Sequence, residues 1–338
     1  MVVLNVLCDL SGGGAERMVL HLCRFAHHPV RVVTIQGGGE LSGDFAYAGV
    51  SVRCARRIRR HPGGRALMRL ARWSAEADLI HTHLWDGDFF GRIAGALVGR
   101  PVVTTEHNTR PDSSLRGVVT AAMAPLSEAV VFVSEAAARA AVMPARRKRV
   151  IENGIDLTRF QPGPLRSGPM RRLLAVGRLA PQKGFDVLLR ALHGVPDLSL
   201  TILGEGEQRP LLQALADPLG DRVRMPGWVA DIRPFLADAD LVVIPSRWEG
   251  FGLIAVEAMA SGRPVLASGV DGLVEVIGDA GMLVPPSDPG ALAAALLDLK
   301  QDRPAREEMR RRGLAQAERF DIRRTADRYA ALYRSILS

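Results

Sequence analysis

The sequence predicts an α/β protein built from two Rossmann-like, doubly wound parallel-sheet domains that face each other across a cleft. Short apolar segments alternate with helical patterns along the chain, as in parallel strands covered on both faces. The pattern stops in a Pro- and Gly-rich stretch at 161–169 and then starts again. The chain has 338 residues, whereas single cores stop growing at about 250–300 residues. Two domains are therefore expected.

The first domain is expected to span 1–163 and the second 170–318, and 319–338 form a separate C-terminal segment. Candidate strands of the first domain are 2–7, 31–35, 77–83, 101–107 and 129–134. Candidate strands of the second are 172–177, 198–204, 222–227, 240–246 and 264–268. Apolar residues at helical spacing predict one amphipathic helix in the C-terminal segment.

Composition narrows the function classes. The chain is 47% hydrophobic and 24% charged, which is typical of globular proteins. No apolar run reaches the roughly 18–20 residues of a membrane helix, and the start VVLNVL lacks the charged region of a signal peptide. Cys8, Cys23 and Cys54 are too far apart to predict a disulfide framework or a metal-binding pair. A cytoplasmic protein is expected.

The chain carries a formal charge of +8, which favours anionic partners such as phosphates or lipid headgroups. Aromatic residues make up only 5%, and no basic–aromatic stripe indicates a nucleic-acid partner. The basic run RRIRRH at 56–61 is a candidate contact for an anionic acceptor or for the inner membrane face, and a solvated loop is the alternative. The sequence indicates no oligomeric state.

Ligands of open α/β sheets bind outside the carboxyl ends of the strands, so the loops there are the first candidates. The first strand is followed by CDLSGGGAER at 8–17. Gly13 and Gly14 stand before a helix, where backbone N–H groups can approach an anion. A simple tight turn is the alternative.

The strand at 172–177 leads into GRLAPQKGFDVLLRAL at 177–192, with a helix beginning near Gly184. Arg178 and Lys183 lie in the loop that enters this helix. Two cations and a helix N-terminus would favour a diphosphate there. A solvated basic loop is the alternative.

The strand at 240–246 leads into SRWEGFGLIAVEAMASG at 246–262. Glu249 precedes a predicted helix over 253–260, and Glu257 lies on its second turn. Eight helical residues span about 12 Å, roughly the length of a sugar–diphosphate–ribose unit. Ionised carboxylates only accept hydrogen bonds, which suits sugar hydroxyls. Two surface glutamates are the alternative.

Together these segments resemble family-4 retaining glycosyltransferases of the GT-B fold over nearly the whole chain. The matching pieces are GGGAER (12–17), DLIHTHL (78–84), VVTTEHN (102–108), VSEAA (133–137), ENGID (152–156), AVGRLAPQKGFDVLLRAL (175–192), LGEGEQR (203–209) and PSRWEGFGLIAVEAMASGRPV (245–265). The most specific piece is the pair of glutamates separated by seven residues in the last block. The resemblance also implies that the C-terminal helix returns to the first domain.

The resemblance implies a role for each matching residue. Arg178 and Lys183 hold the diphosphate, Glu249 contacts the donor sugar, and His107 contacts it near its 6-position and the reaction centre. These four form the predicted catalytic set. The predicted donor-binding residues are Gly13, Gly14, Gly204, Val229, Gly250, Phe251, Gly252, Leu253 and Glu257.

The function implied is transfer of a sugar from a nucleotide-diphosphate sugar, with a UDP-sugar favoured, to an acceptor hydroxyl with retention of anomeric configuration. The acceptor is a glycan, a lipid-linked sugar or a small natural product. No cofactor and no metal are expected, because protein cations offset the charge of the leaving group. A non-catalytic or epimerase-type GT-B protein that binds nucleotide sugars is the alternative.

His83, Asp86 and Asp88 follow a strand of the first domain and are the acceptor-side candidates. Asp86 and Asp88 also spell the D-x-D pattern of some metal sites, as do Asp238 and Asp240, which lie at the amino end of a strand. His81 and His83 share one face of a strand, and a core or cleft-lining role is favoured over metal binding. A dinucleotide-binding oxidoreductase is disfavoured, because neither glycine loop has the G-x-G-x-x-G spacing.

Overall fold

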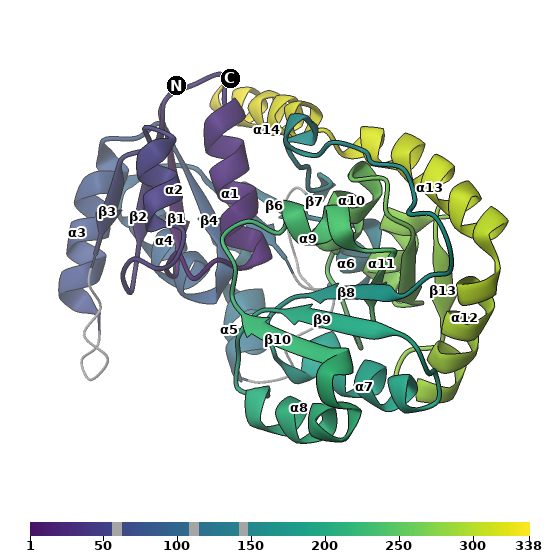
Figure 1. Cartoon of the computed structure of the whole chain (residues 1–338). Helices are drawn as coiled ribbons and strands as arrows, with labels where there is room; N and C mark the ends of the chain where they lie inside the picture. The colour runs from purple at the N-terminus through teal and green to yellow at the C-terminus, as the bar shows by residue number, and fades with distance from the viewer. Residues whose placement is uncertain (56–62, 108–114, 142–147) are drawn as a thin grey trace. The chain divides into compact units, whose positions relative to one another are not determined.

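The computed structural model describes residues 1–55, 63–107, 115–141 and 148–338, so the basic run at 56–61 lies outside the described residues. The chain divides into two compact units (Figure 1). Unit 1 comprises Met1–Ile155 and Ile322–Ser338, and unit 2 comprises Asp156–Asp321. The first boundary therefore lies eight residues before the predicted end of domain 1 at 163, and the last helix groups with unit 1.

Unit 1 is built on a seven-stranded parallel sheet with the order β3-β2-β1-β4-β5-β6-β7. Its strands are β1 (Val3–Leu7), β2 (Val30–Thr34), β3 (Val52–Cys54), β4 (Leu79–His83), β5 (Val102–Glu106), β6 (Ala129–Phe132) and β7 (Lys148–Val150). Five of them match predicted strands. The edge strands β3 and β7 were missed, because three residues are too few to show a pattern.

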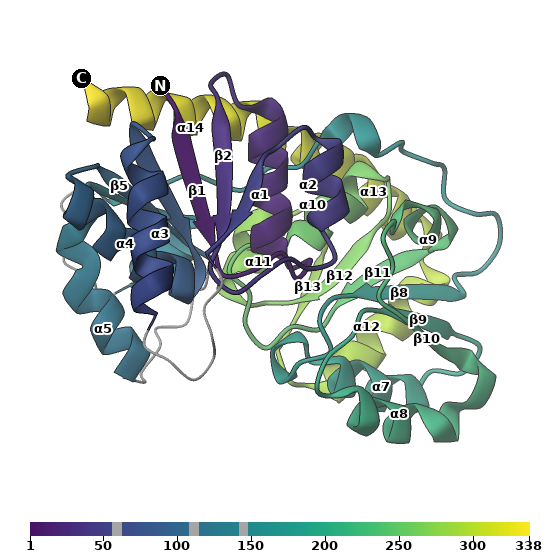
Figure 2. The ribbon, with the colours of Figure 1, turned by 90° about the vertical axis from the view of Figure 1, so that its left-hand side faces the viewer.

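Helices cover both faces of this sheet. They are α1 (Gly14–Phe25), α2 (Ser42–Tyr47), α3 (Gly64–Ala75), α4 (Leu84–Val98), α5 (Leu115–Met123), α6 (Glu135–Ala140) and α14 (Ile322–Leu337). Apolar residues of α1, α2 and α14 form one core with alternate residues of β1, β4 and β5, while α3 and α4 cover the opposite face (Figure 2). Consecutive strand residues point to opposite faces, so each strand contributes to both cores.

Unit 2 repeats this architecture with a six-stranded parallel sheet of order β10-β9-β8-β11-β12-β13. Its strands are β8 (Arg172–Val176), β9 (Ser199–Leu203), β10 (Val223–Gly227), β11 (Leu241–Ile244), β12 (Val265–Ser268) and β13 (Met282–Val284). Its α-helices are α7 (Phe185–His193), α8 (Arg209–Ala216), α9 (Arg233–Asp238), α10 (Leu253–Ala260), α11 (Asp271–Ile277), α12 (Pro289–Gln301) and α13 (Arg303–Ala317). The five predicted strands are present, and the edge strand β13 was missed.

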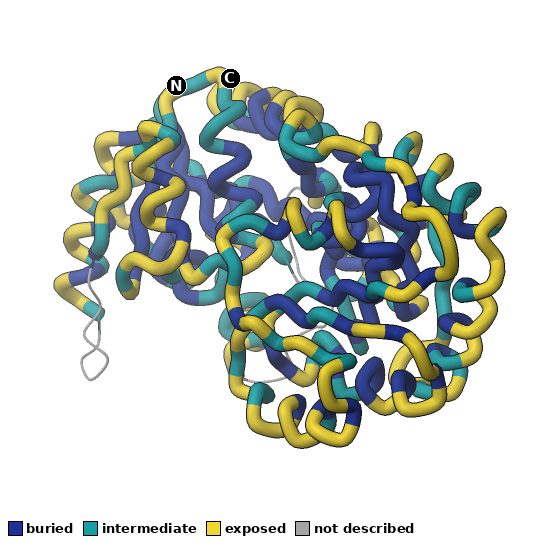
Figure 3. Tube along the Cα trace, viewed as in Figure 1, coloured by how far each residue is buried: buried dark blue, intermediate teal, exposed yellow. Residues whose placement is uncertain are grey.

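Figure 3 shows the buried strands in dark blue and the exposed helix faces in yellow. In both units the strand order reverses at the first strand, between β1 and β4 in unit 1 and between β8 and β11 in unit 2. Such a switch point leaves a crevice at the carboxyl ends of the two strands. Within the described parts of the chain, no helix is long and apolar enough to cross a membrane.

Candidate functional site

The loop that follows β8 places two predicted cations at the switch point of unit 2. Gly177 and Arg178 end the strand, and a 3₁₀ turn over Pro181–Lys183 leads into α7. Gly184 separates this turn from the helix with a φ of +64°, a left-handed conformation that glycine adopts without steric cost. The helix begins at Phe185, one residue after the predicted start.

The loop that follows β11 brings the predicted acidic residue to the same place. Lys183 Nζ lies 2.5 Å from Glu249 Oε2, and Ser246 Oγ lies 3.3 Å from the same oxygen. The lysine side chain is 21% exposed and the glutamate side chain 11%. A pair that is largely withdrawn from water is held more firmly than a surface ion pair. The structure thus joins two residues predicted to act on the same donor.

Helix α10 presents an open N-terminus beside this pair. Its N-cap is Gly252, with a φ of 92°, and no side chain caps the helix. Its first turn also contains no acidic residue. The first backbone N–H groups of a helix have no intrahelical partner and attract anions. Leu253 therefore begins a helix whose N-terminus suits a phosphate, and Glu257 is half-buried one turn further on.

The two loops form one interlocked body. The backbone N–H of Arg247 donates to the carbonyl of Gln182 at 2.8 Å, and Gln182 Nε2 donates to the carbonyl of Trp248 at 3.1 Å. The Arg247 guanidinium also binds both oxygens of Asp186 at 2.7 and 2.8 Å. These hydrogen bonds lower the pKa of Asp186 and raise that of Arg247. Sequence reasoning missed Arg247, although it stands two residues before Glu249.

Packing leaves no room for a side chain where these loops meet. A Cβ at Gly184 would lie 2.1 Å from the carbonyl oxygen of Pro245, and one at Gly272 would lie 2.3 Å from that of Glu249. The ring of Phe251 is buried and meets Phe320 edge-on, with ring centroids 5.4 Å apart. The backbone from Gly250 to Gly252 is therefore held on both sides.

The loops after β9 and β10 extend this body. The backbone N–H of Gly204 donates to the carbonyl of Gly227 at 2.8 Å, and that of Leu179 donates to the carbonyl of Glu205 at 2.8 Å. A Cβ at Gly204 would lie 2.0 Å from the carbonyl oxygen of Gly177. Val229 follows β10 and is half-buried. The predicted residues Gly204 and Val229 thus belong to loops at the same end of the sheet as Arg178.

Arg178 differs from the other cations in this region. Its side chain is exposed, and within the described residues its guanidinium has no hydrogen-bonded partner. Lys183 is already paired with Glu249, and Arg247 with Asp186. Arg178 therefore keeps its donors for a ligand. A planar guanidinium can bind a phosphate through two parallel N–H groups.

The glycine loop before α1, which was also predicted to bind a phosphate, is less open to an anion than the loops of unit 2. Gly13 is the N-cap of α1, and a Cβ there would lie 2.6 Å from Glu16 Oε2. The carboxylate of Glu16 is buried and turned back toward the N-cap, as in a capping box. The position predicted for a donor phosphate beside Gly13 and Gly14 is therefore approached by a carboxylate of the chain itself, which repels a second anion.

His83 does not fit the prediction that it contacts an acceptor. Its side chain is 0% exposed, and both ring nitrogens have partners. Nε2 lies 3.1 Å from Asn5 Oδ1, and Nδ1 lies 3.2 Å from His107 Nε2. The last residue of a buried strand points into the core here because α1 and α14 cover that face. Only His107, half-buried after β5, is open to a ligand in this cluster.

A second network lies on the same face of the sheet. His81 Nε2 lies 2.7 Å from Thr105 Oγ1, and His81 Nδ1 lies 2.7 Å from the hydroxyl of Tyr333. The hydroxyl of Tyr329 lies 3.0 Å from Thr105 Oγ1. Burial lowers the pKa of His81 to about 3, so the imidazole is neutral. This role in the core agrees with the favoured interpretation of His81.

Asp86 and Asp88, the other acceptor-side candidates, are also buried. Asp86 accepts hydrogen bonds from Gln36 Nε2 and from the Cys8 thiol, whose sulfur lies 3.8 Å away. Asp88 lies two residues further along α4 and therefore points in almost the opposite direction, toward the sheet. There it shares a buried cluster with Arg92 and Glu106. Asp88 is therefore turned away from solvent, and its acceptor role stays a prediction.

Other groups of the protein already bind the carboxylates of the second D-x-D pair. Asp238 pairs with Arg166 and Arg172, and Asp240 accepts two backbone N–H groups at 2.8 and 2.9 Å. Across the described residues, no group of three or more His, Cys, Asp or Glu side chains could hold a metal ion. That the reaction needs no metal stays a prediction.

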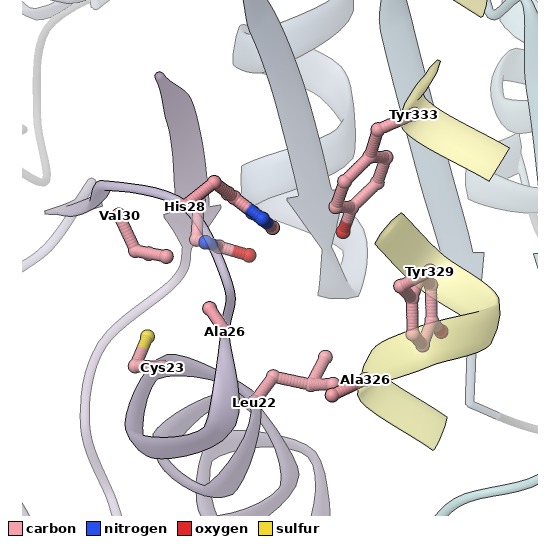
Figure 4. A pocket seen from close by; sticks show the side chains of 9 residues that line it. Leu22, Cys23, Ala26, His28, Val30, Ala326, Tyr329 and Tyr333 are labelled. Atoms are coloured by element: carbon pink, nitrogen blue, oxygen red, sulfur yellow. The ribbon is translucent and has the colours of Figure 1, made fainter. Parts of the chain in front are cut away.

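A small pocket of unit 1 is lined by Asn5, the partner of His83, but by none of the predicted residues themselves (Figure 4). It lies between α1, the start of β2 and α14, where His28 meets Tyr333 edge-on with ring centroids 5.5 Å apart. Its described lining is mostly apolar and contains none of the predicted site residues. We therefore place the candidate site at the loops and not at this pocket.

Two family models together match most of the chain. Residues 12–159 match Glycosyltransferase Family 4, and residues 170–302 match Glycosyl transferases group 1. The chain is 30% identical to phosphatidyl-myo-inositol mannosyltransferase of Mycolicibacterium smegmatis, covering 94% of this chain and 90% of that protein. It is 31% identical to D-inositol 3-phosphate glycosyltransferase of Thermobispora bispora, over 77% and 71% of the two chains.

Solved structures share the fold. HepE of Anabaena, crystallised with UDP-glucose, has a TM-score of 0.91 at 24% identity, over 99% of this chain and 100% of that one. Sucrose-phosphate synthase of Thermosynechococcus elongatus has a TM-score of 0.80 at 24% identity, over 99% of each chain. With two parallel-sheet α/β units and these relatives, the protein has the GT-B fold and belongs to glycosyltransferase family 4.

Proposed function

We propose that this glycosyltransferase takes its sugar from a nucleotide-diphosphate sugar, with UDP-sugars favoured, and transfers it to an acceptor hydroxyl with retention. The ion pair between Lys183 and Glu249 is the observation that carries this proposal. It stands between two interlocked loops at the switch point of unit 2, beside the open N-terminus of α10. HepE, which shares the fold, was crystallised with UDP-glucose, and this supports a uridine nucleotide.

The arrangement suits a reaction in which negative charge grows on a departing diphosphate. Arg178, Lys183 and the first N–H groups of α10 offer positive charge at fixed positions, and such preorganised groups stabilise a developing anion. Glu249 accepts hydroxyl groups of the donor sugar and favours its oxocarbenium-like state. On donor binding, the phosphate replaces Glu249 as the partner of Lys183, and Glu249 turns to the sugar. Glu257 then accepts hydroxyls of the ribose.

Retention follows from the family resemblance. The acceptor hydroxyl attacks the face from which the diphosphate departs, and a leaving phosphate oxygen takes the acceptor's proton. The resemblance implies that His107 contacts the donor sugar. Because protein cations offset the charge of the diphosphate, we expect turnover to be unchanged after metal removal with EDTA; loss of activity that added Mg²⁺ or Mn²⁺ restores would contradict this.

The acceptor class is open to direct test. The two relatives described above are named for transfer to inositol phosphate and to phosphatidyl-myo-inositol. We therefore place an inositol-type hydroxyl first among the acceptors, before glycans, lipid-linked sugars and small natural products. Product analysis by NMR reports both the acceptor and, from the anomeric coupling constant, whether configuration is retained.

The deciding experiment incubates the protein with a panel of UDP-, GDP- and ADP-sugars, with and without inositol acceptors, and measures donor consumption by mass spectrometry. With the best donor, Lys183→Gln and Glu249→Gln should each lower kcat/KM by at least about a hundredfold, because each removes a charged contact of the transition state. Binding without turnover would instead indicate a non-catalytic nucleotide-sugar binder.

Lys300→Gln is a matched control in the same unit. Like Lys183, Lys300 pairs with a carboxylate, that of Asp197 at 3.3 Å, but Asp197 precedes β9 and lies at the amino end of the sheet. We expect this variant to keep wild-type kinetics. Equal losses in the Lys183 and Lys300 variants would show that unit 2 is merely destabilised, and the assigned role of Lys183 would then fail.

A further inference from the structure

Three polar side chains form a line across the sheet of unit 1 and end at His107. Asn5 is in the middle of β1, His83 ends the adjacent β4, and His107 follows the next strand, β5. The distance from Asn5 Oδ1 to His83 Nε2 is 3.1 Å, and that from His83 Nδ1 to His107 Nε2 is 3.2 Å. Asn5 is 4% exposed and His83 is 0% exposed. The line therefore runs from the core to a half-buried end.

From this line we infer that Asn5 and His83 are positioning residues that fix which nitrogen of His107 carries the proton. The amide oxygen of Asn5 only accepts hydrogen bonds, so His83 must carry its proton on Nε2. His83 Nδ1 is then bare and accepts a hydrogen bond from His107 Nε2–H. The remaining nitrogen, His107 Nδ1, is left as an acceptor.

The effect of this tautomer on sugar binding rests on the proposed function. An imidazole nitrogen without a proton accepts a hydrogen bond from a hydroxyl group. If His107 contacts the donor sugar, the line presents a fixed acceptor to one sugar hydroxyl. The opposite tautomer would present an N–H there, and the hydroxyl would lose its preferred orientation.

Burial keeps both rings neutral near pH 7, and so preserves this arrangement of protons. It holds the pKa of His83 well below its ordinary value and lowers that of His107 to about 4. Neither ring is an imidazolium near pH 7, so each carries one proton. In a neutral histidine, the partner of one nitrogen decides the state of the other.

The neighbouring His81 shows that the fixed tautomer is specific to the line that ends at His107. His81 shares the strand, the face and the complete burial of His83. Its two nitrogens, however, face the hydroxyls of Thr105 and Tyr333, each 2.7 Å away. A hydroxyl can donate or accept, so these contacts do not impose one tautomer. The line from Asn5, by contrast, starts at the amide oxygen, an atom that cannot donate.

Long-range ¹H–¹⁵N NMR spectra of the histidine rings test the inference in the wild-type protein. The chain has 8 histidines, and the spectrum of His107→Gln identifies the His107 signals. We expect one tautomer, with the proton on Nε2 and Nδ1 bare. A proton on Nδ1 of His107 overturns the inference, whether or not activity is measured.

Asn5→Leu removes the starting acceptor with little change in volume. We expect both tautomers of His107 in this variant and a loss of about tenfold in kcat/KM for the sugar nucleotide that the wild type uses. Inhibition by UDP, which lacks the transferred sugar that His107 would contact, should be unchanged. Equal weakening of UDP and the sugar nucleotide, or a single unchanged tautomer, would overturn the inference.

Thr105→Val is the matched control, since it breaks the His81 network in the same buried layer. It should leave the His107 tautomer and the ratio of UDP to sugar-nucleotide affinity unchanged; a shifted tautomer here would show that core disruption alone causes the effect. If the wild type consumes no nucleotide sugar, the proposed function fails, while the wild-type ring spectrum still decides the proton order.

Discussion

Asp88 is a carboxyl group that the fold holds away from water. It is 4% exposed, and within the described residues its Oδ1 has no hydrogen-bond partner. Arg92 is the neighbouring cation, and its guanidinium donates to Thr104, Ser127 and the carbonyl of Thr120. Burial, and then the charge of Glu106, raises the pKa of Asp88 well above its ordinary value. Folding therefore favours the protonated form of Asp88.

This shift predicts a pH-dependent effect of Asp88→Asn. In the folded state Asp88 keeps its proton at pH values where the unfolded chain has lost it, so its contribution to stability is present at low pH and falls as pH rises. Asparagine cannot ionise. We expect the free energy of unfolding of Asp88→Asn to exceed that of the wild type by a growing margin as the pH rises above the ordinary pKa of an aspartate, by up to about 1.4 kcal/mol per pH unit.

Urea unfolding at a series of pH values measures this difference. Asp86→Asn is the paired variant, because Asp86 is buried on the same helix but accepts hydrogen bonds from Gln36 and Cys8. We expect it to be less stable than the wild type at every pH in the range. Parallel curves for Asp88→Asn and the wild type would rule out the proposed protonation of Asp88.

At the scale of elements, the candidate site depends on loops that fit one another. The backbone N–H of Arg247 and the side-chain amide of Gln182 each donate a hydrogen bond between the loops after β8 and β11, and Gly184 allows their close approach. Such a body holds Lys183 and Glu249 at fixed positions before a ligand arrives. Preorganisation of this kind reduces the free energy lost on binding.

Gly184→Ala should weaken donor binding. The added Cβ would lie 2.1 Å from the carbonyl oxygen of Pro245 and push the two loops apart. We expect at least about a tenfold rise in KM for the donor, together with a lower melting temperature. Gly99→Ala is the control. Gly99 has nearly the same backbone angles as Gly184, φ 66° and ψ 31°, but nothing within 4 Å of its Cβ position. It should show the backbone strain without the loss of affinity.

The C-terminal helix α14 supplies core groups to unit 1. Tyr329 and Tyr333 are buried, and their hydroxyls bond Thr105 and His81. We expect Tyr333→Phe to lower the free energy of unfolding by about 1–3 kcal/mol, because His81 Nδ1 is left buried without a partner. Chemical denaturation measures this loss. Tyr47→Phe, on a side chain that is 90% exposed, should be neutral, and a neutral Tyr333→Phe would refute the importance of this bond.

At the scale of the whole molecule, the predicted residues divide between the two units. Arg178, Lys183, Glu249 and Glu257 lie in unit 2, whereas Gly13, Gly14 and His107 lie in unit 1. A ligand that binds only the folded state stabilises the part that holds it, by about 2.7 kcal/mol at a hundred times its Kd. Stabilisation by UDP should therefore be local.

Hydrogen exchange followed by mass spectrometry can test this expectation. Saturating UDP should slow exchange in the loops at 177–184, 203–209 and 245–253. It should leave the backbone around Gly13 unchanged, because Glu16 already approaches that helix terminus. Protection around Gly13 that equals the protection around Lys183 would restore the original prediction of a phosphate site there.

The amino-acid sequence alone determined the class of fold, the positions of the longer strands along the chain, and the loops that carry Arg178, Lys183 and Glu249. Strand patterns, glycine turns and motif spacing are local features, so they are visible before folding. The tertiary structure decided which polar side chains meet or become buried. Asn5 and His83 are 78 positions apart and touch only because β1 and β4 are neighbours in the sheet. The burial of Asp88 and the pairing of Lys183 with Glu249 likewise depend on which surfaces pack together, a non-local property that no short segment encodes.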